Sequence, residues 1–398
     1  TSPKHFALNN LENTRFDLSA EIDPRALREV YLPHFRRCVV GAGAASVMSA
    51  YNKMNGVYCG ENVELLQTIL REEWGFRGFV ESDWFLGARS TADSLNAGLD
   101  IEMPAPFRYA DDKLDEAVAK GDLDEATIER GARRSIYQKV AWQLGENEIA
   151  GKQRPDESVV ECEEHVLLAR EAALKSIVLL KNEGEVLPLE AREGLSIAVV
   201  GDLATIANLG DRGSSMVTPS SVSKPLEAIV AAAGSASVEH FESHVDLSRL
   251  AEFDVTVVVA GLTYRDEGEF IPIAQQDAEE TEFAKGGDRA DLALPLGQRD
   301  LIERAAAAAQ RTIVVLQGGS AIIMRDWIDR VDAVLISWYG GQEGGRALAQ
   351  ILFGEQSPSG RLPISIPRQM SDFMPWDVTS LSVHHDLRPG YRWLEHHQ

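Results

Sequence analysis

Cysteine is scarce in this sequence and is not arranged for a disulfide framework or a structural zinc site. Only three cysteines occur among the 398 residues, Cys38, Cys59 and Cys162. Their number is odd, their spacing is wide and no Cys-x-x-Cys pair is present, which argues against both a disulfide-rich domain and a zinc ribbon. No group of His, Asp and Glu residues has the spacing of metal ligands either. We therefore expect neither a metal nor another cofactor.

Long hydrophobic runs and an excess of positive charge are also lacking. No run of about 18 apolar residues is present, so no membrane-spanning helix is expected. The 39 Lys and Arg residues stand against 62 Asp and Glu residues, a formal net charge of -23, which argues against a nucleic-acid partner. No signal peptide is visible and Thr1 is not a natural start, so the compartment stays open, with the cytoplasm slightly favoured over secretion. Homo-oligomerisation is left open.

Apolar segments that alternate with helical patterns predict an α/β protein in two parts, joined by a linker. The elements expected in the first part, residues 1–145, are strands at 44–51, 78–83 and 99–103 and helices at 61–74, 114–118 and 128–140. Residues 146–165 are polar and contain Gly and Pro, which is typical of a linker. Residues 368–398 are expected to form a tail.

The second part, residues 166–367, contains four continuous Val- and Ile-rich runs. They lie at residues 197–200, 255–259, 312–316 and 333–336. Runs without polar alternation indicate parallel strands that are covered on both faces. The segment 266–287 is long, polar and irregular, and loops of that length in a compact domain are usually functional or disordered.

The most informative segment is 78–84, a short apolar run that ends on Asp83 and Trp84. In a barrel of parallel strands the active site lies at the carboxyl ends of the strands. A carboxylate beside an aromatic plate is what a sugar-cleaving enzyme needs, because one supplies the nucleophile and the other an apolar face for the sugar ring. Neighbouring segments add side chains that can line such a site: Lys4, His5, Arg15, Met48 and Tyr51.

Each of these residues also has a purely structural explanation when it is considered alone. A Lys-His pair near a terminus is more often on the surface, a strand-end Tyr such as Tyr51 is more often in the core, and Asp83 could cap a helix. Their joint placement at successive strand ends is what favours a site.

A second carboxylate is needed for glycoside cleavage, as proton donor. The loop that follows the predicted strand 255–259 offers Asp266, Glu267 and Glu269 around a glycine. The alternative is a solvated acidic loop without a catalytic role, and the loop alone does not decide between the two.

Taken together, the motifs resemble glycoside hydrolase family 3, of the β-glucosidase type. The motifs that carry the resemblance in the first part are Lys4-His5-Phe6, Glu12-Asn13-Thr14-Arg15, Val47 to Asn52, Asn55-Gly56 and Ser82-Asp83-Trp84. Those of the second part are Ser176 to Asn182, Leu187-Pro188-Leu189, Gly287-Asp288-Arg289, Leu292 to Gln298, Gln342 to Gly345, Leu352-Phe353-Gly354 and Pro358 to Pro363. They cover nearly the whole chain in the family's order.

The resemblance implies a retaining mechanism and a fold to perform it. Asp83 would be the nucleophile and Glu267 the acid/base, with Glu269 as the alternative. The residues that match the family's substrate pocket are Lys4, His5, Arg15, Met48, Tyr51 and Trp84, and the loop 211–215 would approach it. The implied fold is the C-terminal half of a (β/α)8 TIM-like barrel followed by an α/β sandwich domain with a mostly parallel sheet. The implied partner is a β-glucoside or oligosaccharide.

The chain departs from the family at both ends. The family's barrel begins well before the Lys4-His5 motif, so we expect about half of a barrel to be absent, together with an early Asp that grips the sugar. Residues 390–393 resemble the start of a third, fibronectin-like domain. One subgroup of the family uses a single domain and a His-Asp dyad on N-acetylglucosaminides, which the full second part disfavours.

Three other functions are alternatives for this sequence. The first is a carbohydrate-binding or regulatory homologue without catalysis, which the intact Asp83 argues against. The second is a β-xylosidase or a deglycosylase of natural products in the same family. The third is a nucleotide-binding protein, but neither Gly-x-Gly-x-x-Gly nor Gly-x-x-x-x-Gly-Lys-Ser/Thr occurs.

Overall fold

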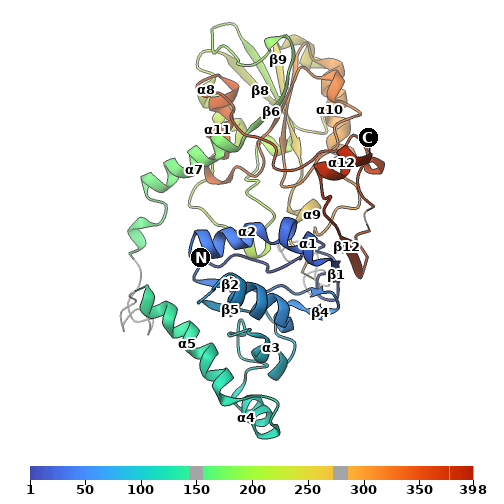
Figure 1. Cartoon of the computed structure of the whole chain (residues 1–398). Helices are drawn as coiled ribbons and strands as arrows, with labels where there is room; N and C mark the ends of the chain where they lie inside the picture. Colours follow the sequence, from blue (N-terminus) through green and yellow to red (C-terminus); the bar gives the residue numbers. More distant parts are fainter. Residues whose placement is uncertain (143–155, 272–285, 376, 398) are drawn as a thin grey trace. The chain divides into compact units, whose positions relative to one another are not determined.

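The computed structural model describes residues 1–142, 156–271, 286–375 and 377–397. The chain divides into two compact units (Figure 1). The first comprises Thr1–Pro155 and Asp377–Arg392, and the second comprises Asp156–Trp376 and Trp393–Gln398. Residues 146–155 of the predicted linker and residues 272–285 of the long polar segment lie outside the described residues.

The first unit is centred on four parallel segments. Strand β2 (Ser46–Met48) pairs in parallel with β5 (Phe79–Glu81), as Figure 1 shows. Phe6 bridges to Ser49 beyond β2, and Ile101 bridges to Glu81 at the end of β5. Segments that are far apart in the sequence therefore lie side by side in parallel, and their carboxyl ends are next to each other.

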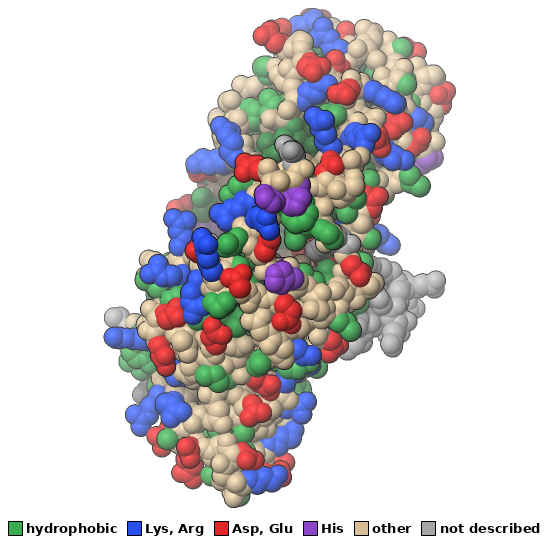
Figure 2. Space-filling view, turned by 45° about the vertical axis from the view of Figure 1, so that its right-hand side comes forward, with side chains coloured by type: hydrophobic (Ala, Val, Ile, Leu, Met, Phe, Trp, Pro, Cys, Tyr) green, Lys and Arg blue, Asp and Glu red, His purple; other side chains and the backbone are tan. Residues whose placement is uncertain are grey.

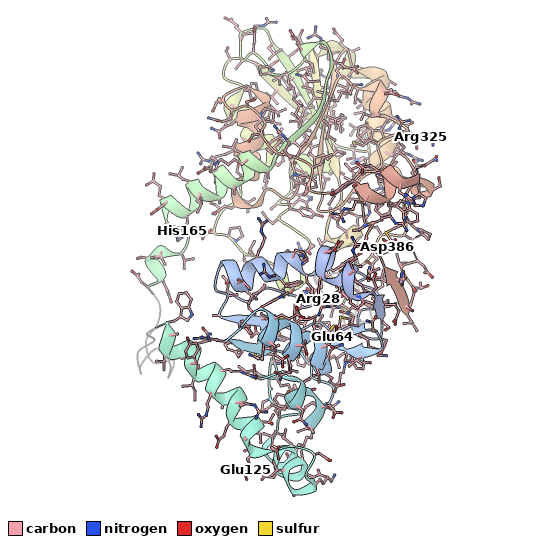
Figure 3. The ribbon with its side chains drawn as sticks, viewed as in Figure 1. Arg28, Glu64, Glu125, His165, Arg325 and Asp386 are labelled. Atoms are coloured by element: carbon pink, nitrogen blue, oxygen red, sulfur yellow. The ribbon has the colours of Figure 1, made fainter. Side chains whose placement is uncertain are left out.

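Helices cover these strands because their apolar residues recur every three or four positions. The predicted helix 61–74 corresponds to η4 (Glu64–Glu73), which buries Leu65, Leu66, Ile69 and Leu70 completely. Arg28 of η1 (Leu27–Tyr31) lies 2.8 Å from Glu73 and 3.7 Å from Glu64 on the surface of η4 (Figure 3). The other helices of this unit are α1 (Pro24–Ala26), α2 (Pro33–Arg36), η2 (Arg37–Gly41), η3 (Cys59–Glu61), α3 (Ala92–Ala97), α4 (Asp111–Lys120) and α5 (Glu125–Ala141).

A buried ion-pair network ties β5 to the helices behind it. The carboxylate of Asp100 lies 2.7 Å from Arg71 of η4 and 2.7 Å from Arg134 of α5. It also accepts a hydrogen bond from the backbone N–H of Val80. Burial raises the pKa of Asp100, and the two guanidinium groups oppose that change. Because breaking such a buried pair leaves an uncompensated charge, this network fixes the position of β5.

A second sheet of the first unit includes a strand from the end of the chain. Its order is β12 (Ser382–His385), β1 (Ser19–Ile22), β3 (Lys53–Met54) and β4 (Val57–Tyr58). Strand β12 pairs in parallel with β1, and His385 at its end is buried with its ring 4.9 Å from that of Tyr31. Burial lowers the pKa of His385 to about 4, with the charge of His384 acting in the same direction and Asp386 (Figure 3) opposing it.

This histidine makes the first unit sensitive to acid. In the unfolded state His385 takes up a proton near the ordinary pKa of histidine, whereas in the folded state it does so only near pH 4. The free energy of unfolding therefore decreases as the pH falls from the ordinary pKa of histidine to about 4. We expect the free energy of unfolding to fall by up to about 3 kcal/mol more in the unchanged protein than in a His385→Phe variant between pH 7 and pH 4. Urea unfolding at a series of pH values measures this free energy. The same dependence on pH in the two proteins would contradict the prediction.

The second unit is built on a six-stranded sheet in the order β6-β11-β10-β9-β7-β8. The bounds are β6 (Val178–Asn182), β7 (Ser196–Val200), β8 (Ser237–Phe241), β9 (Val255–Gly261), β10 (Thr312–Gln317) and β11 (Ala333–Ile336). Only β6 is antiparallel to its neighbour. The four predicted strands are confirmed as β7, β9, β10 and β11. Strand β8 was missed because it is an edge strand of mixed polarity.

Helices lie on both faces of this sheet, which explains its continuous apolar strands. Residues of α7 (Glu163–Ser176), α8 (Pro225–Ala232) and α11 (Gly344–Leu352) share one apolar core with it, and α10 (Leu296–Ala308) shares the other (Figure 1). The remaining short helices are η5 (Glu157–Val159), η6 (Glu183–Glu185), η7 (Asp202–Ala204), η8 (Gly213–Ser215), η9 (Ser248–Glu252), α9 (Tyr264–Glu267), η10 (Ile328–Arg330), η11 (Gly341–Glu343), η12 (Met370–Asp372) and α12 (Tyr391–His397). The expected α/β class with parallel sheets is confirmed.

The strand order also indicates where a ligand would bind in this unit. The parallel strands follow the order 2-1-3-4-5 of doubly wound folds, in which β7 is the first strand and β9 the third. In such sheets ligands bind beyond the carboxyl ends of the strands, where the order reverses. A ligand of this unit would therefore be expected at the loops that follow β7, β9, β10 and β11.

Charge is spread over the surface that Figure 2 shows, where Lys and Arg side chains lie among Asp and Glu side chains. Among the helices of the described ranges, none is long and apolar enough to cross a membrane.

Candidate active site

Asp83 lies just beyond the carboxyl end of β5, in a tight turn. Ser82 before it is fully buried, and its hydroxyl accepts a hydrogen bond from the backbone of Met103 at 2.9 Å. The backbone N–H of Trp84 donates to Asp83 Oδ1 at 2.8 Å, and that of Gly87 donates to the Asp83 carbonyl at 3.2 Å. Asp83 itself is only 7% exposed. The carboxylate is therefore held in one direction and largely shielded from water.

The turn requires a glycine at position 87. A Cβ atom there would lie 2.5 Å from the Asp83 nitrogen and 2.6 Å from its carbonyl oxygen, closer than packed atoms can approach. Gly87→Ala is therefore expected to displace Asp83. Since Asp83 is the predicted nucleophile, kcat/KM should fall by about 10²-fold, because small displacements of a reacting group cost rates of that order.

The matched control is Gly41→Ala, since a Cβ atom on Gly41 meets nothing within 4 Å. Both variants are assayed on a nitrophenyl glycoside, with circular dichroism as a check of folding. A folded Gly87→Ala variant with the rate of the control would contradict the prediction.

His5 is a titratable side chain that the fold brings to Asp83. Its Nε2 atom lies 3.3 Å from Asp83 Oδ2, and the two side chains are 24% and 10% exposed. Oδ2 is shielded from solvent and takes no regular hydrogen bond from the described part of the chain. The parallel pairing of residues 1–6 with β2, and of β2 with β5, creates this pair.

Arg15 lies against the Tyr51 ring, and Tyr51 in turn contacts the backbone of Trp84. The guanidinium of Arg15 is buried, lies 2.7 Å from Glu12, and is 5.1 Å from the centres of the Phe16 and Tyr51 rings. The Tyr51 hydroxyl donates to the carbonyl oxygen of Trp84 at 2.8 Å. Tyr51 therefore supports the residue next to Asp83.

The other predicted pocket residues differ in exposure. Met48 is buried at the end of β2, Lys4 is exposed, and Trp84 is 39% exposed. Arg89 was not predicted, yet it donates to the Phe16 carbonyl at 2.6 Å and lies over the Tyr58 ring. Nothing in its sequence neighbourhood separates it from a surface arginine.

Glu267, the predicted acid/base, lies in the second unit at the end of the short helix α9. The Thr263 side chain and Asp266 cap this helix reciprocally. Glu267 Oε1 accepts hydrogen bonds from the Gly319 N–H at 2.5 Å and from the Tyr339 hydroxyl at 2.6 Å. The Ser320 hydroxyl donates to Oε2. One carboxylate therefore joins the loops that follow β9, β10 and β11.

Arg289 lies behind this cluster. It donates to the Ser320 hydroxyl at 2.9 Å and to the carbonyls of Ala321 and Ala293 at 2.7 and 2.8 Å. Burial lowers its pKa, and the charges of Glu267 and Asp266 oppose that change. Arg289 belongs to one of the motifs that resemble the family, whereas the sequence did not indicate a role for Ser320 or Tyr339. Their signal is their position directly after β10 and β11.

Glu269, the alternative acid/base, contacts the loop that follows β7. The Ser214 N–H donates to Glu269 Oε2 at 2.5 Å, and the Arg212 guanidinium lies 4.0 Å from the centre of the Tyr264 ring. The predicted loop 211–215 therefore lies against the segment that carries both candidate glutamates. Within the described ranges, no group of three or more His, Cys, Asp or Glu side chains is arranged to hold a metal ion.

Family models match both parts of the chain. The model of the glycosyl hydrolase family 3 N terminal domain matches residues 1–137, and that of the family 3 C-terminal domain matches residues 177–392. The chain is 37% identical over 412 residues to thermostable beta-glucosidase B of Acetivibrio thermocellus, with coverage of 98% of this chain and 51% of that protein. It is 36% identical over 395 residues to an exo-alpha-(1->6)-L-arabinopyranosidase of Bifidobacterium breve, with coverage of 94% and 48%.

Solved structures show the same likeness. The Bifidobacterium adolescentis GH3 beta-glucosidase superposes with a TM-score of 0.82 at 33% identity, over 99% of this chain and 56% of that one. Beta-glucosidase 3B from Thermotoga neapolitana, in complex with glucose, gives a TM-score of 0.81 at 29% identity, over 98% and 58%. The chain spans about half the length of the relatives that it matches.

Proposed function

The chain belongs to glycoside hydrolase family 3, and from this premise we propose that it carries the catalytic groups of a retaining β-glycosidase. The proposed substrate class is glycosides with a terminal, non-reducing β-D-glucosyl residue. The observation that carries the proposal is Asp83, a shielded carboxylate at the end of a parallel strand, with His5 Nε2 at 3.3 Å and the Trp84 ring partly exposed beside it. A nucleophile and an apolar plate are the two features that this chemistry needs at the sugar.

The proposed reaction is a double displacement. Asp83 attacks the anomeric carbon, the glycosidic C–O bond breaks, and its electron pair goes to the leaving oxygen while Glu267 donates a proton to that oxygen. Water then attacks the glycosyl ester, Glu267 accepts the proton of the water, and the Asp83 carboxylate is restored. Glu269 is the alternative acid/base. The proposed sugar-binding residues are Lys4, His5, Arg15, Met48, Tyr51 and Trp84.

We also propose the fold in finer terms, as the C-terminal half of a (β/α)8 TIM-like barrel followed by an α/β sandwich domain. The four parallel segments of the first unit, with their helices, correspond to the barrel half in residues 1–145. The doubly wound sheet corresponds to the sandwich domain in residues 166–367. We assign residues 146–165 to a linker and 368–398 to a tail.

A second sugar specificity has a specific observation in its favour. The identity to an exo-alpha-(1->6)-L-arabinopyranosidase, 36%, is almost that to beta-glucosidase B, 37%. An α-L-arabinopyranoside is therefore the rival substrate, ahead of a β-xyloside or a glycosylated natural product. A homologue that binds sugar without cleaving it is the rival function.

The experiment that tests the proposal uses the 398-residue chain and the longest natural polypeptide that contains it. Hydrolysis of nitrophenyl β-D-glucoside, β-D-xyloside and α-L-arabinopyranoside gives the specificity. A 2-deoxy-2-fluoro-β-D-glucosyl fluoride should label Asp83 covalently, as detected by mass spectrometry of the peptides. Glucose binding without any hydrolysis or labelling would establish the non-catalytic homologue instead.

A further inference from the structure

The carboxylate of Glu267 is held by groups from two other loops, those that follow β10 and β11. Tyr339 and the Gly319 backbone donate to Oε1 at 2.6 and 2.5 Å, and Ser320 donates to Oε2. We propose that Tyr339 and Ser320 are positioning residues for Glu267, which orient its carboxylate and stabilise the charge that forms there when its proton passes to the leaving oxygen. This inference rests on the proposed function, because it assigns these residues through the role of Glu267.

Tyr339 is built to act as a donor. Its position is set by Trp338, which adopts the left-handed backbone conformation with φ of 55° two residues after the buried end of β11. Such a conformation is costly for a bulky residue, and it persists where the surroundings fix it. Here the Trp338 indole donates to the Ser176 carbonyl at 3.0 Å. The turn is therefore anchored, and Tyr339 is the residue that follows it.

The ionisation of Tyr339 supports the same role. Burial raises the pKa of its hydroxyl well above its ordinary value, and the charge of Glu267 raises it further. The phenol therefore keeps its proton throughout the working pH range. A hydroxyl that holds its proton and faces a carboxylate oxygen at 2.6 Å donates to it.

Ser320 is directed toward Glu267 by Arg289. A serine hydroxyl has a single proton and can accept hydrogen bonds at the same time. The Arg289 Nη1 atom donates to Ser320 Oγ at 2.9 Å, so the serine proton is left for Glu267 Oε2. Arg289 is itself fixed by the carbonyls of Ala321 and Ala293. The cation therefore acts on Glu267 through an oriented serine.

The backbone of Gly319 packs closely on the same groups. A Cβ atom there would make a tight contact of 3.2 Å with the Tyr339 ring and an ordinary contact of 3.5 Å with Glu267 Oε1. The backbone N–H reaches the carboxylate beside the phenol, at 2.5 Å. With both oxygens held, the plane of the carboxylate is fixed before the reaction, which is how preorganised dipoles lower a barrier.

The test is the dependence of the rate on the leaving group. Tyr339→Phe and Ser320→Ala are expected to lower kcat/KM for an alkyl β-glucoside by about 10- to 100-fold, because a hydrogen bond to a charged group is lost. The value of kcat/KM covers only the steps up to formation of the glycosyl ester, and dinitrophenolate leaves without a proton. The kcat/KM for a dinitrophenyl β-glucoside should therefore change by less than about threefold. The control is Tyr137→Phe on α5, where the side chain is half-exposed.

The outcomes separate this inference from the proposed function. If Glu267→Ala loses no activity on the alkyl glucoside, the proton donor of the proposed function is wrong. Suppose that Glu267→Ala is slow. If the two positioning variants then slow both substrates equally, or slow neither substrate, the positioning inference is overturned and the proposed function stands. Thermal melting identifies a variant that does not fold. If Tyr339→Phe does not fold, Ser320→Ala, which removes only one hydroxyl, tests the positioning inference by itself.

Discussion

Replacing Asp83 by alanine should abolish hydrolysis, with kcat/KM for a nitrophenyl β-glucoside lowered by at least about 10³-fold. The carboxylate is the only group that the proposal assigns to form the glycosyl ester, and its loss removes the covalent route. Its position is set locally by hydrogen bonds to Trp84 and Gly87. Steady-state kinetics of the purified variant measures the effect, with circular dichroism to confirm folding.

Azide sharpens this test, because it can replace the missing nucleophile from the same face of the sugar. A single displacement by azide inverts the anomeric carbon, so Asp83→Ala with azide should yield an α-glycosyl azide. Asp93→Ala is the matched control, since Asp93 lies exposed on α3 of the same unit. Near-normal hydrolysis by Asp83→Ala would refute the assignment of the nucleophile.

Replacing Glu267 by alanine should lower the rate by about 10²- to 10⁴-fold for substrates whose leaving group needs a proton. The reason is that the first step loses its acid and the second step loses its base. Azide needs no base to attack the glycosyl ester. Because that attack is the second of two inversions, the product should be a β-glycosyl azide, which distinguishes this variant from Asp83→Ala by product analysis.

Glu269→Ala is the comparison that decides between the two glutamates. Both lie on the loop after β9, but Glu267 accepts hydrogen bonds from the loops after β10 and β11, whereas Glu269 accepts one from Ser214 after β7. If the slow, azide-rescued phenotype belongs to Glu269→Ala and Glu267→Ala is nearly normal, Glu269 is the acid/base. Glu267 would then be a structural link between loops.

Some of the fold could be predicted because burial leaves a local pattern. The strands β7, β9, β10 and β11 are continuous apolar runs, and the helix η4 repeats its apolar residues at helical spacing. The edge strand β8 lacks such a pattern, since one side of it meets no further strand. The pairing of β12 with β1 could not be predicted either, because its register joins segments more than 350 residues apart.

The candidate site also contains residues that the sequence indicated and residues that it did not. Asp83 and Trp84 stand out because they end an apolar run, and Glu267 and Glu269 because they lie on an irregular loop after a strand. Tyr339, Ser320 and Arg89 did not stand out, because their roles depend on partners. The Tyr339–Glu267 and Ser320–Glu267 bonds join residues 72 and 53 positions apart, and no local pattern pairs the two ends of either bond.

Apolar periodicity and short motifs are local properties of the chain. They were enough to predict several buried strands, the side chains that follow their carboxyl ends and the family that the motifs resemble. The partners of each candidate site residue depend on the fold. His5 meets Asp83 through the parallel pairing of three segments, and Tyr339 meets Glu267 through neighbouring strands of one sheet. Hydrogen bonds act over about 3 Å, and only folding brings residues so far apart in the chain within that distance.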